Sequence, residues 1–118
     1  MKKIKTLKMN YEFKNAFSKG KYYIGKQIIV YIMKNNLDYN RIGIAISTKL
    51  CNAVKRNKIK RVVRAVYQSE KNLNLNGYDI VFTWNKKSKV EDLNFNIVLE
   101  DMKYIFLKSG LKRWKEYL

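Results

Sequence analysis

The stretch from Asn52 to Gln68 constrains the fold more than any other part of the chain, because it contains no acidic residue and repeats its apolar residues with helical spacing. The apolar positions follow the i, i+3, i+4, i+7, i+8 pattern, and they are Ile59, Val62, Val63, Val66 and Tyr67. A helix with one narrow apolar side has to pack that side on another element. We therefore expect a helix here that docks on a sheet.

The opposite side of this predicted helix is cationic. Its expected members are Arg56, Asn57, Lys60, Arg61, Arg64 and Gln68, with Lys58 at the border. Like charges four residues apart repel each other, so a polyanion lying against this side would stabilise the helix. The wider region 39–69 holds eight cations and no carboxylate, and the whole chain has a formal charge of +17. A solvated cationic surface is the alternative, and we favour phosphate binding.

Apolar alternation and turn signals predict the remaining elements. A short helix is expected to begin at the N-cap Asn10 and to run through Lys19. Strands are expected at 22–24, 27–33, 41–47 and 78–84, and a last helix is expected from Ser88 to about Lys108, opened by a capping box with Glu91. Helices and strands in this order indicate an α+β fold with one sheet. The 118 residues suit one compact core, so we expect a single domain over residues 1–118.

The residues that are missing exclude most protein-based catalysis. The chain has no histidine and one cysteine, Cys51, so it offers no imidazole base and no disulfide within the chain. Its nine acidic residues are scattered, which argues against a metal-dependent nuclease site. No apolar run is long enough to span a membrane, and no apolar signal core follows the lysine-rich start. We expect a cytoplasmic protein.

The order of residues inside the basic helix resembles a known signature. Residues 53–64 read Ala-Val-Lys-Arg-Asn-Lys-Ile-Lys-Arg-Val-Val-Arg, which is similar to the Arg-Asn-Arg motif of the bacterial ribonuclease P protein subunit. Segments 7–17, 41–49 and 78–81 extend the likeness over nearly the whole chain. The sequence departs from the usual family pattern at Thr48, Cys51, Lys58 and Asn85. Lys58 keeps the charge of an arginine but loses its forked phosphate geometry.

The resemblance implies a protein that assists an RNA enzyme. In that family the protein binds a catalytic RNA and helps it remove the 5′ leader from precursor tRNA, while the RNA and its magnesium ions perform the hydrolysis. The expected partners are therefore the ribonuclease P catalytic RNA and precursor tRNA, without a membrane or an obligate protein partner. Magnesium bound mainly by the partner RNA is the expected cofactor, and no organic cofactor is expected. The implied fold has an α-β-β-β-α-β-α order, a four-stranded sheet and a rare left-handed crossover.

The resemblance also implies two RNA surfaces, with no catalytic or metal-binding residue. The residues expected to bind the catalytic RNA are Lys49, Arg56, Asn57, Lys58, Lys60, Arg61 and Arg64. Phe13, Phe17 and Tyr31 are expected to stack on bases of the single-stranded leader. Two phenylalanines four residues apart are more often ordinary core, which is the alternative for Phe13 and Phe17. A ribosomal or other structural RNA-binding protein, with no role in cleavage, is the alternative function.

Overall fold

The chain contains the elements that the sequence predicts, in the predicted order. The computed structural model describes residues 4–70, 73 and 75–112. The elements in chain order are α1 (Asn10–Lys19), β1 (Lys21–Ile24), β2 (Ile28–Lys34), β3 (Arg41–Ile44), α2 (Ala53–Ser69), β4 (Tyr78–Trp84), the short 3-10 helix η1 (Val90–Asp92) and α3 (Phe95–Ser109). This confirms the α+β class and the α-β-β-β-α-β-α order.

The four strands form one mixed sheet in the order β1-β2-β4-β3. β2 pairs antiparallel with both β1 and β4, whereas β3 and β4 are parallel neighbours. A parallel pair needs a crossover connection, and α2 supplies it between β3 and β4. The left hand of this crossover stays a prediction of the family resemblance. At the β3 edge the N-terminal segment is tied to Ile42, whose amide donates to Lys5 O and whose carbonyl accepts from Leu7 N.

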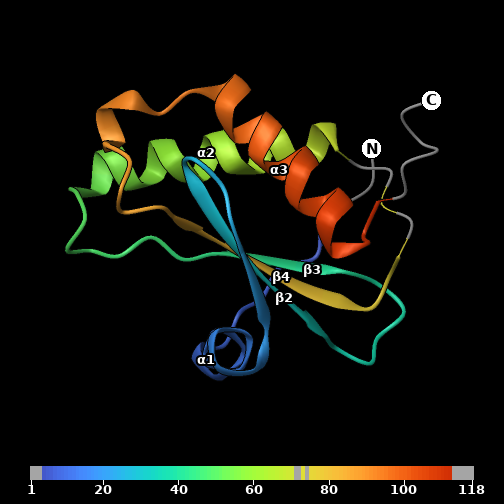
Figure 1. Ribbon diagram of the computed structural model, residues 1–118. Coiled ribbons are helices and arrows are strands. Elements are labelled where there is room, and N and C mark those ends of the chain that lie inside the picture. The colour runs from blue at the N-terminus through green and yellow to red at the C-terminus, as the bar shows by residue number, and fades with distance from the viewer. Residues whose placement is uncertain (1–3, 71–72, 74, 113–118) are drawn as a thin grey trace.

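Helices cover the two faces of the sheet unequally. Figure 1 shows α2 and α3 together on one face and α1 on the other. The larger core lies under α2 and α3, where Ile59, Val63 and Val66 are fully buried against the sheet. Val62 and Tyr67 are half-buried beside them. The predicted apolar stripe of the basic helix is therefore confirmed as its docking side.

The last helix begins later than its sequence signals indicate. Ser88 and Glu91 do not open it; α3 begins at Phe95, and the Asn94 side chain caps it by accepting from the amides of Asn96 and Ile97. Leu93, at φ −47° and ψ 124°, interrupts the path between η1 and α3. The Glu91 carboxylate instead accepts from Lys55 Nζ at 3.0 Å. The capping box is therefore a wrong prediction, because Glu91 pairs with α2 rather than with its own helix.

Two smaller boundaries also differ. The N-cap of α1 is Met9 rather than Asn10, which is the first helical residue. Strand β3 ends at Ile44 instead of Ser47, because the chain leaves the sheet and turns, with Leu50 N donating to Ser47 O. This early end places Ala45, Ile46, Ser47 and Leu50 in the lining of a cleft.

Candidate nucleic-acid interface

Helix α2 carries a continuous cationic surface along its exposed side. Its start is fixed by Asn52, whose side chain accepts from Lys55 N at 2.9 Å. Docking by the apolar stripe then turns the polar positions outward. We define the cationic face as Asn57, Lys58, Lys60, Arg61 and Arg64, of which Lys60 is half-buried and the others are exposed. In the part of the chain that the structure describes, none of its four cations forms an ion pair.

Arg56 departs from its predicted place on this face. Three residues before Ile59 correspond to a rotation of about 300°, which leaves Arg56 about 60° from Ile59 and within the arc of the apolar stripe. The residue is half-buried, and its Nη1 donates to Cys51 O at 2.7 Å. Part of its hydrogen-bonding capacity therefore holds the loop before α2, and the expectation that it lies opposite the apolar stripe is wrong.

Lys49 lies away from the cationic face, in the turn between β3 and α2. Its side chain is exposed, and its amide donates to Ser47 Oγ at 3.1 Å. Ser47, two residues before it, and Leu50, the next residue, line a cleft that also includes Phe17 of α1. Lys49 is thus placed near the rim of that cleft.

The cleft has a volume of about 390 Å³ and lies where β3 and β4 end. Its lining residues are Phe17, Ala45, Ile46, Ser47, Leu50, Thr83, Trp84 and Lys86. The Phe17 ring stands edge-on to the Tyr31 ring, with 4.8 Å between their centroids. Phe17 is 40% exposed, which is high for an aromatic residue in contact with a sheet. We call this site the aromatic cleft; it offers an open ring, apolar walls and one cation.

Phe13 lies elsewhere, although it shares the Phe17 side of α1. Its ring packs on Gly43, where an added Cβ would lie only 2.5 Å from Phe13 Cε1. It belongs to a small core with Leu7, Ala16 and Val81. The structure therefore brings the Phe17 and Tyr31 rings into contact and places Phe13 in a packing position.

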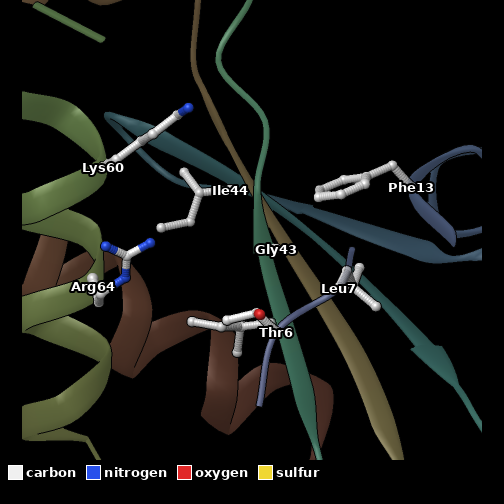
Figure 2. A pocket seen from close by; sticks show the side chains of 8 residues that line it. Thr6, Leu7, Phe13, Gly43, Ile44, Lys60 and Arg64 are labelled. Atoms are coloured by element: carbon white, nitrogen blue, oxygen red, sulfur yellow. The ribbon is translucent and has the colours of Figure 1, made fainter. Parts of the chain in front are cut away.

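A second, smaller cavity crosses the β3 edge of the sheet. It measures about 210 Å³ and is lined by Thr6, Leu7, Phe13, Ile42, Gly43, Ile44, Lys60 and Arg64. In Figure 2, Lys60 and Arg64 extend from α2 toward β3, and Phe13 lies beyond Gly43 on the other side. The cationic face thus reaches the sheet edge at these two residues.

A network of charged groups fixes α1 on the sheet. The Glu12 carboxylate accepts from the amides of Lys8 and Met9 and from Arg41 Nη1. These amide hydrogen bonds, followed by the nearby Arg41 charge, hold the pKa of Glu12 below its usual value. Arg41 also donates from Nε and Nη2 to the two oxygens of buried Asp79, at 2.9 and 2.8 Å. These hydrogen bonds raise the pKa of the Arg41 guanidinium. The network sets the position of the helix that carries Phe17.

Sequence reasoning missed most of the cleft walls. Ala45, Thr83, Trp84 and Lys86 come from strand ends that only the sheet brings together, so no local spacing could identify them. In the described ranges 4–70, 73 and 75–112, no group of three or more His, Cys, Asp or Glu residues could hold a metal ion. No helix in those ranges is long and apolar enough to cross a membrane.

Comparisons with known proteins agree on one family. The family model described as Ribonuclease P matches residues 1–110. The ribonuclease P protein component of Natranaerobius thermophilus is 38% identical over 111 residues, which cover 94% of this chain and 95% of that protein. The solved RNase P protein of Staphylococcus aureus superposes with a TM-score of 0.78 at 28% identity, covering 94% of this chain and all of that one. The RNase P protein of Thermotoga maritima gives 0.77 at 31% identity, covering 88% and 96%.

Proposed function

This chain belongs to the ribonuclease P protein family, and from that premise we propose that it binds two RNAs on separate surfaces. It is a protein component of ribonuclease P and acts in processing the 5′ ends of tRNAs. Family membership sets aside a ribosomal protein without a role in cleavage. The proposal concerns what each surface binds and which partner performs the chemistry.

The catalytic RNA of ribonuclease P binds the cationic face of α2. Arg61 and Arg64 supply forked contacts to phosphates, Lys58 and Lys60 supply point charges, and Asn57 offers a neutral donor and acceptor. The cations lack carboxylate partners within the described residues, so RNA phosphates would not have to displace an internal ion pair. Arg56 holds the loop before α2 through its hydrogen bond to Cys51 O and contributes its charge to this surface. Lys49 contacts phosphate from the turn that precedes α2.

The single-stranded 5′ leader of precursor tRNA binds the aromatic cleft. The exposed Phe17 ring and the half-buried Tyr31 ring beside it provide a surface on which unpaired bases stack with little regard to sequence. Lys86 in the lining and Lys49 at the rim suit the leader backbone. Phe13 contributes through its packing on Gly43, which steadies the helix that presents Phe17.

The observation that carries the proposal is the placement of the two surfaces. The aromatic cleft includes Phe17 of α1 on one side of the sheet, whereas α2 packs on the other side. One small protein can therefore contact an RNA through α2 and still leave the cleft open to a second RNA. Hydrolysis is assigned to the catalytic RNA and to magnesium ions held mainly by that RNA, since the protein's part is to bind and position.

Reconstitution of leader cleavage tests this assignment. Precursor tRNA is incubated at physiological magnesium with a bacterial ribonuclease P RNA, with the protein, or with both, and the 5′ product is measured. We expect efficient cleavage only when both are present. Robust cleavage by the purified protein alone would overturn the assignment of catalysis to the RNA.

A further inference from the structure

The α1 side of the sheet remains uncovered at strand β1. Helix α1 packs near the middle of the sheet, where Ala16 joins a core with Val81 and Phe17 meets Tyr31. Beyond that point, Tyr22 and Ile24 on the edge strand are each 60% exposed. Tyr22 lies directly opposite Tyr31 in the antiparallel pair, so both side chains project from the same face. An exposed aromatic side chain therefore lies beside Tyr31, whose ring contacts Phe17 of the aromatic cleft.

Three rings form a continuous row from the cleft to the edge of the sheet. Phe17 lines the cleft and contacts Tyr31 at 4.8 Å between ring centroids. The next centroid distance, from Tyr31 to Tyr22, is 5.9 Å, with the planes tilted by 41°. Both distances lie within the range of interacting aromatic pairs. We call Phe17, Tyr31 and Tyr22 the aromatic row.

The charge around this row suits a nucleic acid. Residues 10–34, which form α1, β1 and β2, include one acidic residue, Glu12, and its carboxylate is bound to Arg41. The same region has five lysines, Lys14, Lys19, Lys21, Lys26 and Lys34. All five are exposed. A polyanion can therefore lie across the row without meeting a free carboxylate of these elements.

We propose that Tyr22 is a further leader-binding residue, which stacks on a base of the 5′ leader beyond the part held by Phe17 and Tyr31. The inference rests on the proposed function of the aromatic cleft and extends that site to β1. Tyr22 already has its ring held beside Tyr31, so binding requires little additional ordering. A tyrosine also tolerates water at its hydroxyl when no RNA is bound.

The geometry makes leader length the decisive variable. The row crosses the strands from the cleft to β1, so a short leader ends over Phe17 or Tyr31 and only a longer leader reaches Tyr22. The test measures dissociation constants of precursor tRNAs with a series of leader lengths, and of mature tRNA, in the complex assembled with the catalytic RNA. The proteins are the parent, Tyr22→Ala, Tyr22→Phe and Phe17→Ala. Tyr104→Ala is the matched control, because this tyrosine is 55% exposed on α3.

We expect Tyr22→Ala to weaken binding of long leaders by about fivefold or more, the effect of losing one base stack. Binding of short leaders and of mature tRNA should not change. Tyr22→Phe keeps the ring and should behave like the parent, as should Tyr104→Ala. Phe17→Ala should weaken binding of both short and long leaders.

The outcomes separate the two proposals. If Phe17→Ala binds precursor tRNA more weakly and Tyr22→Ala binds every leader like the parent, the role proposed for Tyr22 is wrong. The proposal that the aromatic cleft binds the leader is then retained. If Phe17→Ala also binds all leaders normally, the cleft itself is wrong. If Tyr22→Ala weakened the binding of mature tRNA as much as the binding of long-leader precursors, the inference would also be overturned. Such a result would indicate an effect on assembly or folding.

A second measurement does not depend on a loss of binding. Tyr22→Trp retains an aromatic ring and reports on its surroundings by fluorescence. The parent has tryptophans of its own, including Trp84, so the emission change of the parent is subtracted from that of the variant. We expect the remaining fluorescence of the new indole to be quenched more by long leaders than by short ones. Identical emission changes in the variant and the parent would contradict stacking at Tyr22.

Discussion

Two phenylalanines one turn apart on α1 have different surroundings. The sequence predicts that Phe13 and Phe17 share a helix face, but spacing alone cannot tell which of them is packed. The difference depends on β3, a strand distant in the chain, where Gly43 leaves room for the Phe13 ring. Phe17 lies past that strand's end, over the cleft. The packing interpretation therefore applies to Phe13, whereas the exposed Phe17 ring is the one for which we propose an RNA contact.

Phe13→Ala should lower the free energy of unfolding, because it empties the space between α1 and Gly43. A loss of about 3 kcal/mol is expected, at the lower end for phenylalanine truncation since the ring is half-buried. Phe17→Ala, at an exposed ring, should cost about 1 kcal/mol or less. Urea denaturation of the two variants measures both values. Equal destabilisation would contradict the division of roles between the two rings.

Glu12→Gln should make stability less dependent on acid pH. The folded pKa of Glu12 lies below its usual value of 4.5, chiefly because Met9 and Lys8 amides donate to the carboxylate. A lowered folded pKa stabilises the protein above the unfolded pKa, and this contribution disappears as pH falls through the folded pKa. The variant should therefore be less stable than the parent at pH 7, by about 1 kcal/mol for a helix cap. The difference between the two should shrink below the usual pKa of 4.5, as measured by urea denaturation across pH. A difference independent of pH would be inconsistent with this role of the charge.

Elements were predictable in type and order but less so at their ends. The apolar stripe of α2 and the alternation in β4 are local patterns, and both match the structure. The start of α3 was missed because Glu91 has a partner on α2, Lys55, which is 36 positions away in the sequence. Most of the cleft lining was missed for the same reason, since Thr83 and Ala45 meet only when β4 pairs with β3. Long-range pairing, rather than weak propensity, limited the sequence-based prediction.

The β1–β2 hairpin should depend on one carboxylate of α3. Buried Asp101 accepts from the amides of Lys26, Gln27 and Ile28 at 2.9, 2.8 and 3.2 Å. Asp101→Ala leaves these donors without a partner and should destabilise the fold by about 3 kcal/mol or more. Hydrogen exchange in residues 21–34 should accelerate, because the turn of this hairpin loses its hydrogen bonds to Asp101. The same hairpin carries Tyr22 and Tyr31. The control is Glu100→Ala, an exposed neighbour on α3, which should behave like the parent.

Equal exchange rates in Asp101→Ala and Glu100→Ala would show that α3 does not hold the hairpin. The same comparison bears on leader binding. A displaced hairpin would separate Tyr31 from Phe17. Asp101→Ala should therefore weaken the binding of precursor tRNA more than the binding of mature tRNA.

At the scale of the whole molecule, the distribution of acids matters more than the total charge of +17. Four acids are held by cations in the described structure: Glu12 and Asp79 by Arg41, Glu70 by Lys112, and Glu91 by Lys55. Asp101 is occupied by backbone amides. Among the residues that the structure describes, the four cations of the cationic face, Lys58, Lys60, Arg61 and Arg64, therefore form no ion pair with a carboxylate. The total charge predicted only a polyanion as the partner. The order of residues in α2 indicated the ribonuclease P family.

Removing two of these charges should change how salt affects binding of the catalytic RNA. Each phosphate that the protein no longer neutralises lowers the slope of log K against log salt by about 0.9 for a duplex and about 0.7 for a single strand. The double variant Lys60→Ala/Arg64→Ala should therefore bind more weakly, with a slope smaller by about 1.4 to 1.8. The matched control, Lys103→Ala/Lys108→Ala, removes the same net charge from exposed positions on α3. Titrations of the catalytic RNA at several salt concentrations measure both slopes. If the α3 control lowered the slope as much as the α2 variant, binding would follow net charge alone, and the cationic face would not be the docking surface.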